Sequence, residues 1–180
     1  MDLKEFQKGG LKTQRLKLRS LTLMDATDMF EYTSYPPNSV FLSWEPHRTV
    51  EEDKRFIRET LLKYEKGEEL LFGIQLKNKL IGTVRIYNFN WGKQEAEVSC
   101  ILNQNYTGQG YMYEVYQYIF RELHENFFIN RMVHCVDKNN LGSYKLIQKF
   151  HVISEEPMQY ILKNKQVTWL RVIIDIREEV

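Results

Sequence analysis

The sequence predicts an α+β domain, with mixed α/β character, in which helices cover a mostly antiparallel sheet of seven strands. Two observations predict it. Strand-like and helix-like segments occur in the order strand, two helices, three strands, helix, strand, helix and two strands. The three central strand segments also follow one another across short turns, which is typical of an antiparallel meander. About four helices therefore flank a single sheet.

The N-terminal elements are marked mainly by their caps. Residues 1–12 look like a flexible tail, and the domain proper spans residues 13–178. Alternation with period two predicts a strand at residues 15–19. Thr22 and Asp25 stand three positions apart, an arrangement that begins a short helix.

The remaining elements follow from periodicity and turn residues. A second helix runs from a capping box at Thr49 and Glu52 to Gly67. A long helix ends at about Asn126, and a later one begins at Asn140. The strands expected after the second helix occupy residues 70–77, 80–89, 95–102, 131–136, 158–163 and 167–176.

Length and composition exclude several classes of protein. The chain has 180 residues, the length of one domain, and its 43% hydrophobic content is ordinary for a globular protein. The net charge is +1 and no long basic run is present, so nucleic acid is disfavoured as the main partner. Cys100 and Cys135 lie far apart in apolar stretches, which favours buried thiols in a reducing compartment.

Targeting and metal-binding signals are not found in the sequence. Residues 1–6 lack the apolar core of a secretory signal, and no run is long enough to span a bilayer. We therefore expect a cytoplasmic protein with no membrane partner. His124 and His134 show no ligand-like spacing, so we expect no metal.

The segment from Leu102 to Tyr111 carries the functional signal, because it runs from a strand through Gly108 and Gly110 into a helix. A helix start exposes unpaired N–H groups and the positive end of the helix dipole, and glycines let an anion approach the backbone. Together they predict a cradle for a pyrophosphate. A dinucleotide fingerprint would need a third glycine where Tyr113 stands. On the two glycines alone, a simple tight turn is the alternative.

The loop Asn105-Tyr106-Thr107-Gly108-Gln109-Gly110 resembles the coenzyme A loop of the GNAT acetyltransferases, Arg/Gln-x-x-Gly-x-Gly/Ala. The best match is the ribosomal-protein-alanine branch, which is RimJ/RimL-like, and it covers about residues 12 to 176. Further segments resemble that branch in the same order, namely Thr13 to Arg19, Leu80 to Thr83, Ala96 to Val98 and Asp137 to Ser143. Each motif is weak alone, but together, in the expected order, they make the resemblance strong.

The resemblance implies an acetyltransferase that moves the acetyl group of acetyl-CoA to a primary amine by direct attack in a ternary complex. The acceptor would be a protein N-terminus or a small-molecule amine, and the protein a monomer or homodimer. By resemblance, the strand that ends at Leu102 splays from its neighbour and leaves backbone groups for the cofactor. The residues assigned to the cofactor in this way are Cys100, Ile101, Leu102, Asn105, Thr107, Gly108, Gln109, Gly110, Tyr111, Asn140 and Ser143.

Three positions depart from the family pattern. Asn105 replaces the usual arginine or glutamine, and His151-Val152 stands where the family has Gly-Phe. The tyrosine that some relatives use as a general acid falls at Ile147. The first and last departures motivate an alternative, a non-catalytic acyl-CoA-binding protein with the same fold.

Glu97 is the candidate general base. It alternates with Ser99 and Ile101 along its strand, and it matches a frequent glutamate of the family. If the hairpin turns near Trp91, however, Glu97 lies opposite Arg85, and a cross-strand ion pair is an equal alternative.

Other candidates also have two interpretations. Asn140 is a natural helix N-cap, and that role alone would explain it. Tyr111 and Tyr144 are candidate acids for the departing thiolate, although helix packing explains both. Trp44 and His47 lie on the connection that shapes the acceptor pocket in relatives, so they are candidates for substrate binding. A surface histidine is the alternative for His47.

Overall fold

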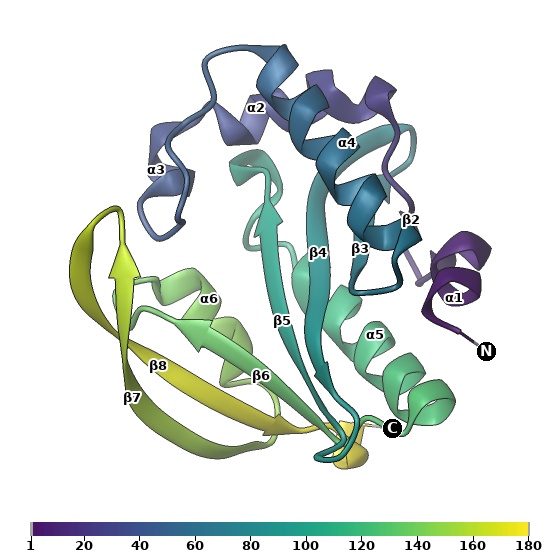
Figure 1. Cartoon of the computed structure of the whole chain (residues 1–180), viewed down its shortest axis with the longest axis vertical. Helices are drawn as coiled ribbons and strands as arrows, with labels where there is room; N and C mark the ends of the chain where they lie inside the picture. Colours follow the sequence, from purple (N-terminus) through teal and green to yellow (C-terminus); the bar gives the residue numbers. More distant parts are fainter. Residues whose placement is uncertain (1, 180) are drawn as a thin grey trace.

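The computed structural model describes residues 2–179, and within them one mixed sheet has the strand order β1-β2-β3-β4-β5-β6-β8-β7 (Figure 1). Every neighbouring pair is antiparallel except β5 and β6, which run parallel. The eight strands are β1 (Leu11–Lys12), β2 (Lys17–Arg19), β3 (Leu70–Leu76), β4 (Lys79–Asn90), β5 (Glu95–Leu102), β6 (Arg131–Val136), β7 (Val152–Leu162) and β8 (Lys165–Asp175).

Helices cover both faces of the sheet (Figure 1). They are α1 (Leu3–Gly9), α2 (Ala26–Thr33), α3 (Pro36–Ser39), α4 (Val50–Glu65), α5 (Tyr111–Phe127) and α6 (Leu141–Ile147). Helix α5 presents Val115, Ile119 and Leu123, all fully buried, to the larger core cluster on one face. Helices α2 and α4 present Met29 and Ile57 to a smaller cluster on the other face. The spacing of these apolar residues explains why each helix packs on a single stripe.

The predicted class is confirmed, whereas two of its details are wrong. The described sheet has eight strands instead of seven, because residues 11–12 pair with residues 17–18 as a short edge. The described residues form six α-helices instead of about four, because the sequence analysis did not predict α1 and α3. In α3, Pro36 stands in the first turn, where proline is compatible with a helix, so the two prolines begin a helical turn there.

The expected flexible tail is also wrong for the described part of residues 1–12. Asp2 and Glu5 form a complete capping box at the start of α1. Phe6 is 3% exposed and packs edge-on against Phe72 and Phe127, with ring centroids 6.0 and 5.1 Å away. The amphipathic spacing of Leu3 and Phe6 explains why this segment docks on the core.

The parallel contact between β5 and β6 is short, and this feature positions the site. Only residues 95–97 of β5 pair with residues 131–133 of β6. Beyond them the two strands diverge, and Figure 1 shows the gap widening toward the end of β5. The peptide groups of Val98 to Leu102 that face β6 therefore have no partner strand on that side.

The register between β4 and β5 differs from the one expected. Glu97 lies opposite Tyr87, and Arg85 lies opposite Ser99. The pairing shifts between Tyr87 and Asn90, where Asn88 has a φ of 51°. Arg85 instead donates from Nε to Glu69 at 2.9 Å. The predicted ion pair between Glu97 and Arg85 is therefore wrong.

Candidate active site

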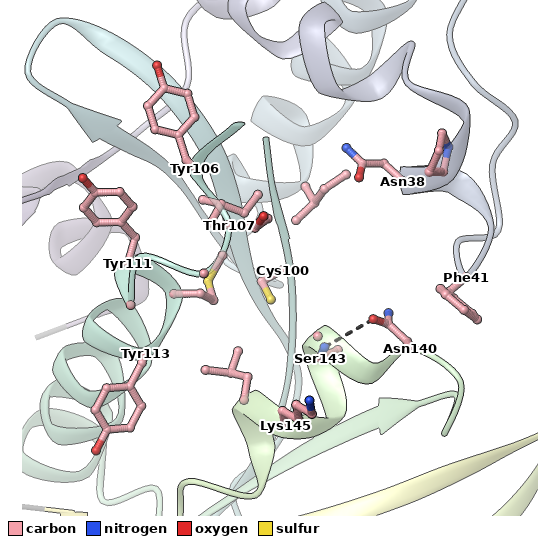
Figure 2. Close-up of a pocket in the computed structure, with 18 of the residues that line it drawn as sticks. Asn38, Phe41, Cys100, Tyr106, Thr107, Tyr111, Tyr113, Asn140, Ser143 and Lys145 are labelled. Carbon is pink, nitrogen blue, oxygen red and sulfur yellow. Dashed lines mark hydrogen bonds between the residues drawn. The ribbon is translucent and has the colours of Figure 1, made fainter. Parts of the chain in front are cut away.

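A cavity of about 540 Å³ opens where β5 and β6 diverge (Figure 2). Its size is that of a typical small-molecule site. Four parts of the chain line it: α3 with the residues after it, the end of β5, the glycine loop with the start of α5, and α6 with the residues that flank it. Of the residues assigned to the cofactor from the sequence, those in the lining are Cys100, Ile101, Leu102, Thr107, Gly108, Gly110, Tyr111, Asn140 and Ser143.

The glycine loop has the backbone that a pyrophosphate cradle requires. Gly108 and Gly110 have φ values of 73° and 78°, a region that side chains other than glycine rarely adopt. Helix α5 begins at Tyr111 without a side-chain cap. In the described part of the chain, the backbone N–H groups of residues 108–110 donate to no other group of the protein. These groups and the helix dipole can therefore act on an anion in the cavity.

A brace from the N-terminal segment holds this loop. Arg15 Nη1 donates to the carbonyl oxygen of Gln109 at 3.0 Å, and Arg15 Nε lies 2.6 Å from Glu114 Oε2 in α5. Thr13 Oγ1 donates to Glu114 at 2.5 Å. The Arg15 guanidinium also stacks 4.5 Å from the centre of the Tyr111 ring. The segment from Thr13 to Arg15 therefore fixes the start of α5 beside the cavity.

Two lysines were missed in the sequence analysis. Lys145 lies in α6 and Lys149 lies four positions later, in the turn that follows the helix, and both line the cavity. Lys149 Nζ lies 5.1 Å from the centre of the Tyr113 ring. The four-residue spacing of these lysines was the feature of the sequence that could have pointed to them. With the glycine loop, the two ammonium groups make this end of the cavity favourable for phosphates.

Residues that alternate along β5 face opposite sides of the sheet. Cys100 lies on the α5 side, where its sulfur is 3.2 Å from the Tyr116 hydroxyl, within hydrogen-bond distance. Burial raises the pKa of the Cys100 thiol to about 11, so this cysteine is a protonated, inert thiol at neutral pH. Ile101 packs on the other side, with the α2–α4 cluster.

Glu97 shares the side of Ile101 and is half-buried at the last position where β5 pairs with β6. Its carboxylate accepts a hydrogen bond from Asn88 Nδ2 at 3.1 Å. Burial, together with the negative charge of Glu97, raises the pKa of the Tyr87 hydroxyl to about 12. Glu97 is not part of the cavity lining, whose first residue in β5 is Cys100, three positions further along the strand.

Asn140 and Ser143 lie together at the start of α6. Asn140 is the N-cap, and its Oδ1 accepts a hydrogen bond from the Ser143 amide at 3.2 Å (Figure 2). The expected N-cap is thus confirmed. The Ser143 hydroxyl lies 3.2 Å from His134 Nε2, a buried ring behind the cavity wall.

Several candidates lie outside the cavity lining. His47 Nδ1 is 3.1 Å from Oδ1 of the fully buried Asp53, and the Trp44 ring is 5.2 Å from the His47 ring. Burial raises the pKa of Asp53. His47 is therefore a partner of a buried carboxylate rather than a free surface histidine.

Three further candidates, two in the glycine loop and one in α6, also lie outside the cavity lining. The Asn105 amide donates to Asn103 Oδ1 at 3.0 Å, and Gln109 Nε2 donates to the Asn105 carbonyl at 3.3 Å. The Tyr144 hydroxyl contacts Glu155, and Ile147 is fully buried in the core. Neither Asn105, Gln109 nor Tyr144 belongs to the lining.

The described residues contain no group of three or more His, Cys, Asp or Glu side chains that could hold a metal ion. No helix among them combines the length and hydrophobicity needed to cross a membrane.

Comparison with known proteins identifies the family. Residues 15–152 match the acetyltransferase (GNAT) domain. The chain is 26% identical to an uncharacterised N-acetyltransferase, YnaD of Bacillus subtilis, over 145 residues, which are 77% of this chain and 79% of the relative.

Solved structures share the fold. An acetyltransferase of the GNAT family from Bacillus anthracis superposes with a TM-score of 0.81 at 19% identity, over 93% of this chain and 98% of the other. RimL, a ribosomal L7/L12 alpha-N-protein acetyltransferase in complex with coenzyme A, gives 0.77 at 16% identity, over 91% and 95%. The chain therefore belongs to the GNAT family of acetyltransferases, enzymes that transfer the acetyl group of acetyl-CoA to an amine.

Proposed function

We propose that this acetyltransferase acts on the α-amino group of a protein or peptide, by direct attack in a ternary complex. The observation that carries the proposal is the cavity at the divergence of β5 and β6, because it joins an end lined by the glycine loop and two lysines to an uncharged end. A cofactor and an amine can meet there without a covalent enzyme intermediate.

The residues of the cavity fit acetyl-CoA. Amides of residues 108–110 and the start of α5 would hold the pyrophosphate, and Lys145 and Lys149 would hold the remaining phosphate. Unpaired peptide groups of residues 98–102 would bind the amide groups of the pantetheine arm. The bound thioester supplies the acetyl carbonyl that the amine attacks.

Glu97 and Ser143 are the proposed chemical groups. Glu97 takes a proton from the amine, directly or through water, as the N–C bond forms. The electron pair of the broken C–S bond remains on sulfur, where the Ser143 hydroxyl donates a hydrogen bond. Ser143 would thus stabilise the departing thiolate at the step for which some relatives use the tyrosine that is missing at Ile147.

The charge of the cavity favours a peptide N-terminus over a polyamine. The lining near α3 consists of Pro37, Asn38, Phe41 and Leu42, and the charged side chains of the whole lining are the two lysines. A polycationic acceptor would need carboxylates that this lining lacks. The likeness to RimL, whose name specifies an alpha-N-protein substrate, supports the same choice.

Turnover with a panel of acceptors tests the proposal. Release of free coenzyme A would be followed with short peptides that begin with serine or alanine, the same peptides with a blocked N-terminus, and spermidine. We expect turnover with the free peptides alone. Preference for spermidine would contradict the acceptor class, and no turnover with any acceptor despite coenzyme A binding would contradict catalysis. The cytoplasmic location and the monomer-or-homodimer state stay predictions.

A further inference from the structure

A chain of four side chains runs behind the cavity wall, from β5 to α6. The Tyr116 hydroxyl lies 3.2 Å from Cys100 Sγ and 3.2 Å from His134 Nδ1. His134 Nε2 lies 3.2 Å from the Ser143 hydroxyl. Both ends of the chain, Cys100 and Ser143, line the cavity, from the strand and from the first turn of α6 respectively (Figure 2).

The two middle members of the chain are inaccessible. Tyr116 is 0% exposed and His134 is 5% exposed, and both are enclosed by the α5 core. Burial lowers the pKa of His134 to about 4, so the ring is neutral at physiological pH. A neutral imidazole has one N–H donor and one acceptor nitrogen, so its two neighbours must play opposite roles.

Two arrangements of hydrogens satisfy this chain. In one, His134 Nδ1–H donates to Tyr116, and Nε2 accepts the Ser143 proton, which is then turned away from the cavity. In the other, Nε2–H donates to the Ser143 oxygen, and Nδ1 accepts from the Tyr116 hydroxyl. Only the second arrangement leaves the Ser143 proton free to point into the cavity.

We propose that Tyr116 and His134 are positioning residues, which hold Ser143 as a hydrogen-bond donor toward the sulfur of the departing coenzyme A. This inference rests on the proposed role of Ser143. Donation by Tyr116 to Nδ1 fixes the Nε2–H tautomer, and that tautomer orients the hydroxyl. In this arrangement the Cys100 S–H can donate to the Tyr116 oxygen, because the Tyr116 proton is donated to His134.

A double-mutant cycle tests the coupling. Tyr116→Phe keeps the ring in the core and removes the hydroxyl, and Tyr118→Phe, on the same helix but outside the core cluster, is the matched control. We expect Tyr116→Phe to lower kcat roughly 10- to 100-fold, as when a hydrogen bond to a charged group weakens, with the Kd for coenzyme A unchanged. In the Ser143→Ala background the same change should have no further effect.

Equal effects of Tyr116→Phe in both backgrounds, or an unchanged kcat in the single variant, would overturn the proposal. Both tests require turnover by the wild-type protein. Absence of that turnover would contradict the proposed function and not this inference. Circular dichroism melting curves separate either result from a loss of folding.

A second readout does not depend on activity. The nitrogen chemical shifts of the His134 ring report which nitrogen carries the proton, and they can be recorded in the wild-type protein with coenzyme A bound. We expect the Nε2–H tautomer, and loss of that preference in Tyr116→Phe. The Nδ1–H tautomer in the wild-type complex would overturn the proposal whatever the kinetics show.

Discussion

At the scale of single residues, Arg15 connects the N-terminal segment from Thr13 to Arg19 with the glycine loop. Asn105 stands where the family loop has arginine or glutamine, and the Arg15 guanidinium, from a segment 90 residues earlier, bonds to the carbonyl of Gln109 in the same loop. Its ion pair with Glu114 neutralises part of its charge, so its main contribution is to hold the loop in shape. Asn105 itself therefore does not argue for a non-catalytic protein.

The residues that the sequence could and could not predict differ in one respect. Gly108, Gly110 and the N-cap Asn140 act through local backbone geometry, which neighbouring residues determine. The pairing of Glu97 depends on a bulge at Asn88, in another strand, and no local pattern reports it. Contacts of His134 are non-local in the same way, so its place behind the cavity could not be inferred.

Substitution of Glu97 tests the proposed base at this scale. We expect Glu97→Gln to lower kcat by about 10²- to 10⁴-fold, because the amide cannot accept the proton, with the Kd for coenzyme A unchanged. Steady-state kinetics and calorimetry measure the two quantities. Glu125→Gln, on the exposed side of α5, is the control. Unchanged activity in Glu97→Gln would remove this residue from the mechanism.

At the scale of elements, the loop between β5 and α5 depends on two left-handed glycines. A Cβ at Gly108 would meet no atom within 4 Å, so the protein itself has room for alanine there. The φ of 73° is nevertheless unfavourable for alanine by about 1–2 kcal/mol. The Cβ would also project from the surface that a pyrophosphate approaches.

We therefore expect Gly108→Ala to raise the Kd for coenzyme A several-fold while the protein still folds. Isothermal titration calorimetry measures the affinity, and thermal melting measures the cost to stability. Gly9→Ala is the matched control, because a Cβ at Gly9 also meets nothing within 4 Å and lies far from the loop in sequence. Equal affinities in the two variants would show that the loop does not hold the phosphates.

The elements that the sequence failed to predict are α1, α3 and β1, which have seven, four and two residues. Of these, α3 and β1 are too short to show a period. The long helices α4 and α5 and strand β5 begin and end within about two residues of the predictions. Periodicity therefore sufficed for these long elements. Strand β7, in contrast, begins at Val152 and not at the expected residue 158, and the lining segment from Pro37 to Leu42 needed the structure.

At the scale of the whole molecule, α1 closes one end of the larger core. Phe6 connects α1 to Phe72 in β3 and Phe127 in α5. Phe6→Ala should lower the free energy of unfolding by about 3–5 kcal/mol, as when a buried phenylalanine leaves a cavity. Urea denaturation measures it, with Lys8→Ala, an exposed change in the same helix, as the control. Equal stability of the two variants would mean that α1 is not docked in solution.

The divergence of β5 and β6 gives the sheet two additional edges inside the molecule. An outer edge such as β7 carries unpaired peptide groups that a strand of another chain can join, which is a route to aggregation. The inner edges have α6 on one side and the segment after α3 on the other, and both segments line the cavity beside them. The fold thus keeps unpaired peptide groups for a ligand between two flanking segments, whereas an outer edge offers such groups openly to a strand of another chain.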